Sequence, residues 1–232
     1  MWGDAWSTAG ERQLVDDGRV VDDPLAPLFF VSYAVIKPPR RTPGGRREAN
    51  TNALRLFSEL SIHVNALVSR PTGADPGYID RNMRGGERWT PDLLEAVGTC
   101  QVFVALLSPA YLDSEWCARE WNLFASRTVV RRDGRPSNET CILPVSWTPA
   151  DSCEPPNYVQ RFSPDGTPDE DLVPTYHQEG LYGLLSMKDP ASDVVLWKLA
   201  QRIVELSRSH WVEPRVLTTP GGIARKFSRR GT

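Results

Sequence analysis

Trp116 and Glu120 are the two residues whose types and spacing are best suited to chemistry. They lie four positions apart in Glu115-Trp-Cys-Ala-Arg-Glu120, and residues four apart in a helix share one face. Such a pair suits a sugar carrying a flat base, because the ring can stack on the base and the carboxylate can stabilise positive charge on the sugar. The alternative interpretation is a solvated helix glutamate paired with a nearby arginine.

Two further segments follow predicted strands and can line the same crevice. Ser32 and Tyr33 end the first strand, and a glycine-containing loop spans residues 82–89. In an open parallel sheet the ligand crevice lies outside the carboxyl ends of the strands. Glycines let a loop change shape, and an arginine can contact phosphate. The candidate binding residues of this loop are Arg84, Gly85, Gly86 and Trp89. The alternatives are a surface turn for the loop and core packing for Tyr33.

Strands and helices alternate along the chain, which predicts a doubly wound parallel α/β sheet of about five strands with helices on both faces. Short apolar or β-branched runs predict strands at 28–34, 77–80, 102–107, 141–147 and near 184–185. Apolar residues at helical spacing, with capping signals, predict helices at 50–67, at 90–98, from 108 to 125 with a break at 113–114, and through 196–206.

Charge and composition divide the chain into three parts. We expect an acidic flexible segment at 1–26, one domain at 27–211 and a basic flexible tail at 212–232. Within the domain, residues 36–49 form a loop with five bases and three prolines, and residues 148–180 form the longest irregular region. The 36–49 loop and the basic tail are candidate docking sites for a protein partner, or else simply solvated.

The overall composition excludes several classes of function. A net charge of −2 over 232 residues argues against a nucleic-acid-binding protein. The sequence shows neither a signal peptide nor a membrane span, so a cytoplasmic protein is expected. The four cysteines have no metal-ligand spacing, which predicts no metal site and no disulfides. The nucleophile-elbow, P-loop and dinucleotide-binding glycine motifs are also absent from the sequence.

The same segments resemble the TIR domain family. The matching features are the strand Phe30-Val-Ser-Tyr-Ala34, the loop ending Gly85-Gly-Glu-Arg-Trp89, the helix motif from Ser108 to Glu120 and the strand Ile142-Leu-Pro-Val145. The resemblance covers roughly residues 27–211, its helix motif is specific, and the layout is most similar to the actinobacterial TIR-like proteins called FxsC. It implies a flavodoxin-like TIR fold.

The resemblance also implies an activity. Enzymatic TIR domains cleave NAD⁺ with a glutamate at the position of Glu120, and in some of them an aromatic residue at the position of Trp116 stacks on the substrate. NAD⁺ is then a substrate, and no cofactor is needed. In the family, the loop that contains Arg84 gates the pocket and mediates self-association. The expected function is therefore an NAD⁺ nucleosidase or cyclase activated by self-assembly in bacterial signalling or defence. The alternative is a non-catalytic module that signals through TIR–TIR contacts.

Overall fold

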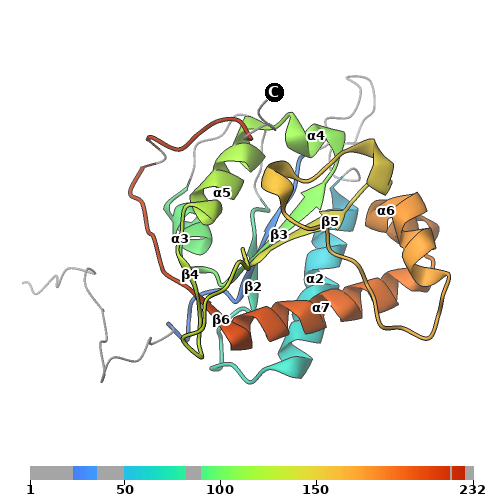
Figure 1. Cartoon of the computed structure of the whole chain (residues 1–232), viewed down its shortest axis with the longest axis horizontal. Coiled ribbons are helices and arrows are strands. Elements are labelled where there is room, and N and C mark those ends of the chain that lie inside the picture. The colour runs from blue at the N-terminus through green and yellow to red at the C-terminus, as the bar shows by residue number, and fades with distance from the viewer. Residues whose placement is uncertain (1–22, 36–49, 82–89, 220, 228–232) are drawn as a thin grey trace, which may run out of the picture.

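The computed structural model describes residues 23–35, 50–81, 90–219 and 221–227 (Figure 1). The predicted 36–49 loop and the glycine loop at 82–89 lie outside the described residues. So do most of the acidic N-terminal segment and the last residues of the basic tail. The division of the chain into three parts stays a prediction.

A four-stranded parallel sheet forms the centre of the domain, in the order β2-β1-β3-β5. Its strands are β1 (Phe29–Ser32), β2 (Gly77–Ile79), β3 (Val102–Leu107) and β5 (Ile142–Ser146). Every residue of β1, β3 and β5 is buried, as expected for strands that are covered on both faces. The predicted doubly wound α/β fold is confirmed.

Helices cover both faces of this sheet (Figure 1). The helices are α2 (Thr51–Leu67), α3 (Pro91–Thr99), α4 (Pro109–Leu112), α5 (Glu115–Ala125), α6 (Leu172–Met187) and α7 (Ala191–Ser209). One layer contains α2 and α7, which pack against each other, with α6 beside them; the other contains α3 and α5. Thr90, Ser108 and Ser114 cap α3, α4 and α5 with their side chains, which stabilises the starts of these helices.

The sheet ends at β5 because its outer edge is blocked. Pro144 has no N–H to offer a further strand, and its carbonyl accepts from Phe162 N at 2.9 Å. Ser146 N donates to the Tyr176 hydroxyl at 2.8 Å. The strand predicted near 184–185 is wrong, since both leucines are buried on α6. Leu181, Leu184 and Leu185 recur at helical rather than alternating spacing.

A small antiparallel pair joins the end of α7 to the end of α5. It consists of β4 (Val129–Arg131) and β6 (His210–Val212). The buried Arg127 guanidinium donates to the carbonyl oxygens of Val97, Cys100, Val212 and Glu213 at 2.7–3.0 Å. The chain after β6 is thereby fixed against α3, and it then runs along the outside of α3 and α5 (Figure 1).

Two single-turn 3-10 helices, η1 (Ala150–Ser152) and η2 (Pro156–Tyr158), interrupt the region predicted to be irregular. α6 bends at Gly180, whose φ of 67° is in the left-handed region. A Cβ there would lie 2.5 Å from the carbonyl carbon of Thr148, so this close approach of α6 to the end of β5 requires glycine. None of the helices in the described part of the chain has the length and apolar character to cross a membrane.

Candidate functional site

Glu120 and Ser32 meet in the interior of the domain. Glu120 lies on the inner face of α5 and is 2 % exposed, and Ser32, the last residue of β1, is fully buried. Ser32 Oγ donates a hydrogen bond to Glu120 Oε2 at 2.5 Å. The fold thus brings together two of the predicted site residues, at the carboxyl end of β1 as the topology requires.

Three other groups complete this cluster. Tyr33 follows Ser32, is 4 % exposed, and donates from its hydroxyl to the carbonyl oxygen of Asp80 at 3.0 Å. Tyr111 on α4 and Cys117 on α5 are both buried beside Glu120. The cluster therefore draws on β1, the end of β2, α4 and α5, and it lies where the loops after β1, β2 and β3 converge.

Burial makes Glu120 an unusual acid. Desolvation is the main cause and raises the pKa of its carboxyl from the ordinary 4.5 to about 8. The hydrogen bond from Ser32 opposes this rise, and the negative charge of Asp80 adds to it. In this structure, with its carboxyl buried, Glu120 is therefore largely protonated at neutral pH.

The neighbouring Tyr33 and Cys117 are also held neutral. Burial raises the pKa of Tyr33 to about 12, with smaller rises from the charges of Asp80 and Glu120. Burial likewise raises the pKa of the Cys117 thiol, and the charge of Glu120 adds to that effect. A thiol held in this form is a poor nucleophile. Glu120 is the member of the cluster whose ionisation falls nearest to neutral pH.

Trp116 lies one turn before Glu120 on α5 and is half-buried against the core. The guanidinium of Arg119 stacks over its ring at 5.4 Å, which is a cation–π contact. Arg119 Nε is buried without a hydrogen-bond partner in the described part of the chain. One face of the Trp116 ring is therefore already occupied, and a stacked base would use the other face or displace Arg119.

One cavity lies at the carboxyl ends of the strands, where a ligand is expected. It measures about 850 Å³, within the range of small-molecule sites. Its lining comes from residues that follow β3, from residues that follow β5, and from the end of the described chain. These residues are Pro109, Leu112–Glu115, Ser152–Asn157 and Arg225–Phe227. We call it the β3–β5 cavity. Glu120 is not part of its lining.

Residues 64–172 match the family model of the TIR domain. Comparisons with curated proteins and with solved structures found no match. Trp116 and Glu120 lie inside the matched residues, whereas Ser32 and Tyr33 precede them. The structure nevertheless places β1 inside the same sheet, between β2 and β3, so this sheet is built from a longer stretch of chain than the match covers. The match does not distinguish an FxsC-type protein from other TIR proteins.

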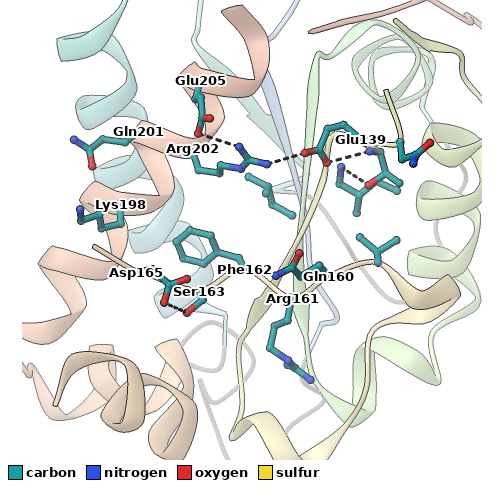
Figure 2. A pocket seen from close by; sticks show the side chains of 15 residues that line it. Glu139, Gln160, Arg161, Phe162, Ser163, Asp165, Lys198, Gln201, Arg202 and Glu205 are labelled. Atoms are coloured by element: carbon teal, nitrogen blue, oxygen red, sulfur yellow. Dashed lines mark hydrogen bonds and ion pairs between the residues drawn. The ribbon is translucent and has the colours of Figure 1, made fainter. Parts of the chain in front are cut away.

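Two other cavities lie away from the carboxyl ends of the strands. One, of about 700 Å³, is at the amino end of β5 beside α7 (Figure 2). Its charged groups already have partners, since Arg202 contacts Glu139 and Glu205 and Lys198 donates to the Gly166 carbonyl. The other, of about 280 Å³, adjoins the chain just before β1, β2 and β3. Neither has the position expected of the active site in this fold.

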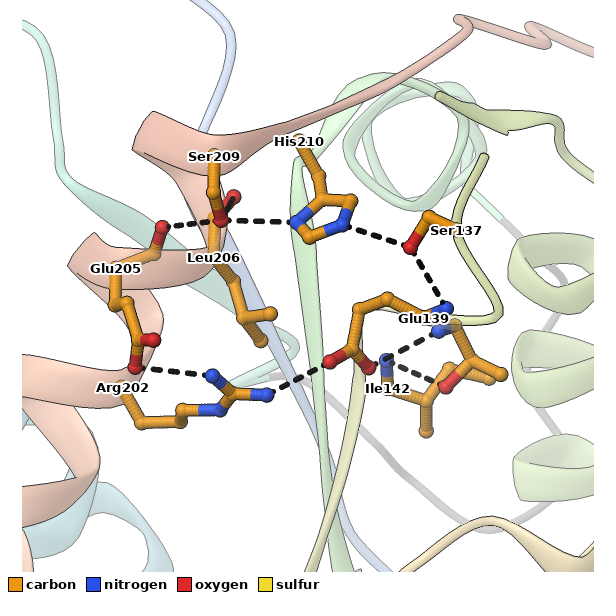
Figure 3. A network of polar contacts seen from close by, with 9 residues as sticks. Ser137, Glu139, Ile142, Arg202, Glu205, Leu206, Ser209 and His210 are labelled. Carbon is orange, nitrogen blue, oxygen red and sulfur yellow. Dashed lines mark hydrogen bonds and ion pairs between the residues drawn. The ribbon is translucent and has the colours of Figure 1, made fainter. Parts of the chain in front are cut away.

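His210 has serine hydroxyls on both sides but is not part of a catalytic triad (Figure 3). Ser137 Oγ lies 2.9 Å from Nε2, and Ser209 Oγ lies 2.9 Å from Nδ1. The Glu139 carboxylate is bound to Arg202 instead of the imidazole, so no carboxylate orients the ring as a triad requires. Burial lowers the pKa of His210, and the network links β6 to the chain before β5. In the described residues, no group of three or more His, Cys, Asp or Glu is arranged to hold a metal ion.

Sequence reasoning missed part of the cluster. Tyr111 and Cys117 stand within the helix motif that carries the family resemblance, and Asp80 ends the second predicted strand, so each had a usable signal. The contribution of Arg225–Phe227 to the β3–β5 cavity had none, because an isolated aromatic in a basic tail has the composition of a solvated segment. The predicted binding residues Arg84, Gly85, Gly86 and Trp89 lie outside the described residues.

Proposed function

We propose that this TIR domain cleaves the nicotinamide–ribose bond of NAD⁺, with Glu120 as the catalytic residue. The observation that carries the proposal is the burial of the Glu120 carboxyl against Ser32, with a pKa of about 8. A purely structural helix glutamate gains nothing from such a position, because burying an ionisable group without a countercharge is unfavourable. Strongly shifted acids in such places are candidates for functional residues.

The reaction asks little of the protein in proton transfer. The bond between C1′ of the ribose and the nicotinamide nitrogen breaks, and its electron pair leaves with the ring as neutral nicotinamide. Water then adds to C1′ and loses a proton, which gives ADP-ribose; in cyclisation the adenosine half of the same molecule adds instead. The difficulty is the positive charge that develops on the ribose, and an ionised Glu120 can stabilise it.

The substrate itself favours the ionised form of Glu120. The nicotinamide ring of NAD⁺ is cationic, and a positive charge near a carboxyl lowers its pKa. Entry of the nicotinamide ring therefore favours loss of the proton from the buried Glu120 carboxyl, which gives the carboxylate that stabilises the transition state. The hydroxyl of Ser32 orients that carboxylate, and Trp116 supplies an aromatic surface for stacking. Contact with the phosphates is expected from Arg84 in the loop that includes Gly85, Gly86 and Trp89.

The second candidate is a non-catalytic interaction module that acts through TIR–TIR contacts. The near-complete burial of Glu120, which is 2 % exposed, favours this second candidate, because a catalytic carboxylate must contact its substrate. We favour catalysis, since an interaction module gains nothing from an acid buried in its core without a countercharge. Self-association remains part of the proposal, as the family resemblance implies for bacterial signalling or defence.

Product analysis of the purified chain tests the proposal. The protein is incubated with NAD⁺ over a range of concentrations, with and without a crowding agent, and the products are separated by chromatography. Release of nicotinamide by the wild type and its loss in Glu120→Gln support catalysis. Glu95→Gln, which changes an exposed glutamate on α3, is the matched control and should keep the activity. Equal rates in wild type and Glu120→Gln, or no NAD⁺ consumption under any condition, would overturn the proposal.

A further inference from the structure

The last described segment, residues 221–227, is bound to the surface of α5. Asn122 Nδ2 donates to the carbonyl oxygens of Ala224 and Lys226 at 3.0 and 2.9 Å. Figure 1 shows this part of the chain in red, ending beside α5 after its course along the outside of the domain. A segment expected from its composition to be a solvated tail therefore has a defined place.

Phe227 packs into an aromatic cluster at the end of this segment. Its ring centroid lies 5.6 Å from that of Tyr111 and 6.0 Å from that of Trp121. Both of these side chains are fully buried. Trp121 Nε1 nevertheless has no hydrogen-bond partner in the described part of the chain. A buried polar group without a partner is unfavourable, and this N–H would be hydrated if Phe227 moved away.

The aromatic cluster adjoins the candidate catalytic residue. Tyr111 lies between Phe227 on one side and the Ser32–Glu120 pair on the other, close enough that the charge of Glu120 affects the tyrosine hydroxyl. Trp121 directly follows Glu120 on α5. Phe227 is thus one side chain removed from the site, on the same side as the β3–β5 cavity, whose wall it forms with Arg225 and Lys226.

The hold on this segment is weak enough to be released. Ala224, Arg225 and Lys226 are exposed. In the described part of the chain the segment is held by the two hydrogen bonds from Asn122, by the contacts of Phe227 with Tyr111 and Trp121, and by the partly buried Ile223. The acidic side chains of Asp113, Glu115 and Glu154 line the same cavity as the two basic residues, which favours docking at low salt. Upstream, by contrast, the Arg127 guanidinium fixes the chain through Val212 and Glu213, so residues 221–227 can detach from α5 without unfolding of the domain.

We propose that residues 221–227 are an autoinhibitory strap, in which Phe227 closes the aromatic cluster of Tyr111 and Trp121 and keeps Glu120 shut off from substrate. The inference rests on the proposed function, because only a catalytic Glu120 needs to become accessible to a substrate. Release of the strap uncovers Tyr111, extends the β3–β5 cavity toward the carboxyl and admits water and NAD⁺.

Three variants of the full chain test the strap. Phe227→Ala removes the ring, Asn122→Ala removes the two hydrogen bonds, and Val216→Ala is the control, since Val216 is on the same C-terminal segment but is 56 % exposed. NAD⁺ consumption is measured alongside hydrogen exchange of the backbone amides of residues 109–125. The strap predicts that the first two variants consume NAD⁺ faster, on the order of tenfold for Phe227→Ala, with faster exchange in α4 and α5. The control should match wild type.

The two readouts separate the failure of the strap from the failure of the proposed function. Faster exchange in 109–125 without NAD⁺ consumption by any variant supports the closure by Phe227 and overturns catalysis. Unchanged exchange with unchanged NAD⁺ consumption overturns the strap. A fall in NAD⁺ consumption in Phe227→Ala, with the thermal midpoint of unfolding retained, also overturns it, because Phe227 would then be part of the wall that binds substrate.

Discussion

Ser32 and Glu120, which are 88 positions apart in the chain, form a buried hydrogen bond of 2.5 Å between the end of the first strand and the inner face of α5. The bond joins a strand that the TIR match does not cover to the helix that carries the family motif. Among the residues that the structure describes, it is also the one contact that draws the Glu120 carboxyl toward its ionised form against the effect of burial. The properties of the candidate site therefore depend on this pair.

Ser32→Ala should weaken the domain and make Glu120 harder to ionise. Loss of a hydrogen bond to a buried carboxyl costs about 1–3 kcal/mol of unfolding free energy, measured by urea denaturation at neutral pH. The pKa of Glu120 should rise further, because the hydroxyl that lowers it is gone. Ser58→Ala is the control, since Ser58 is an exposed serine of α2. A Ser32→Ala protein as stable as the control would show that the hydrogen bond contributes nothing.

The stability of the wild type should fall between pH 5 and pH 8 relative to Glu120→Gln. The pKa of Glu120 is about 8 in the folded protein and near 4.5 when exposed, so in this window the folded state binds the extra proton. Stability then decreases as pH rises, with a limiting slope of about 1.4 kcal/mol per pH unit for one proton. Glutamine has a similar shape and does not titrate. The measurement is the difference in unfolding free energy between the two proteins at a series of pH values.

If the unfolding free energy of the wild type changed with pH in the same way as that of Glu120→Gln, the raised pKa of the buried Glu120 carboxyl would be contradicted. The matched comparison is Glu95→Gln, in which an exposed glutamate is replaced. The difference in unfolding free energy between Glu95→Gln and wild type should stay nearly constant from pH 5 to pH 8, because this substitution leaves the buried Glu120 in place.

Arg127→Lys should be strongly destabilising even though it keeps the charge. The guanidinium donates to four main-chain carbonyls: one in α3, one just after α3, one in β6 and one just after β6. A lysine has three donors on one nitrogen and cannot reproduce this fork, so at least one buried carbonyl loses its partner. We expect a loss of about 2–4 kcal/mol, seen as a lower thermal midpoint. Arg131→Lys, on the partly exposed arginine that pairs with Asp133, should change the midpoint little.

The elements that local signals define were predictable from the sequence. Thr90 followed by proline placed the start of α3, and Ser108-Pro109 with the break at 113–114 placed α4 and α5, as the structure confirms. Buried runs of apolar residues located β1, β3 and β5. Each of these signals depends on neighbours within a few positions, where the spacing of residues determines which face they share.

Features that depend on long-range pairing were not predictable. The topology places Ser32 and Glu120 at the same edge of the sheet, but nothing in the sequence indicates the hydrogen bond between them. Nothing near Arg127 indicates its four carbonyl partners. The buried edge of β5 depends on Phe162, which is 18 residues beyond Pro144 and in a segment without clear periodicity. Phe227 likewise stands in a basic stretch whose composition is typical of a solvated tail. Such contacts arise from tertiary packing, which one sequence does not record.

Gly98→Ala should destabilise the domain, which is the opposite of what helix propensity alone predicts. Gly98 is a buried residue inside α3, and alanine in a helix interior is favoured over glycine by about 1 kcal/mol. However, a Cβ at this position would lie 2.5 Å from the carbonyl oxygen of Arg215, and the Arg215 amide donates to the Gly98 carbonyl at 2.8 Å. Because both contacting groups are main chain, the methyl group can be accommodated only if the C-terminal segment moves off α3.

The expected result for Gly98→Ala is a net loss of about 1–3 kcal/mol of unfolding free energy, typical of an overpacked buried position. Hydrogen exchange should speed up at residues 213–217, where the segment leaves α3. Thr99→Ala provides the comparison within the same helix, since its hydroxyl donates only to the Glu95 carbonyl one turn earlier. If Gly98→Ala proved more stable than wild type, the close contact between α3 and Arg215 would be wrong, and the path of the chain from β6 to Phe227 would have to be different.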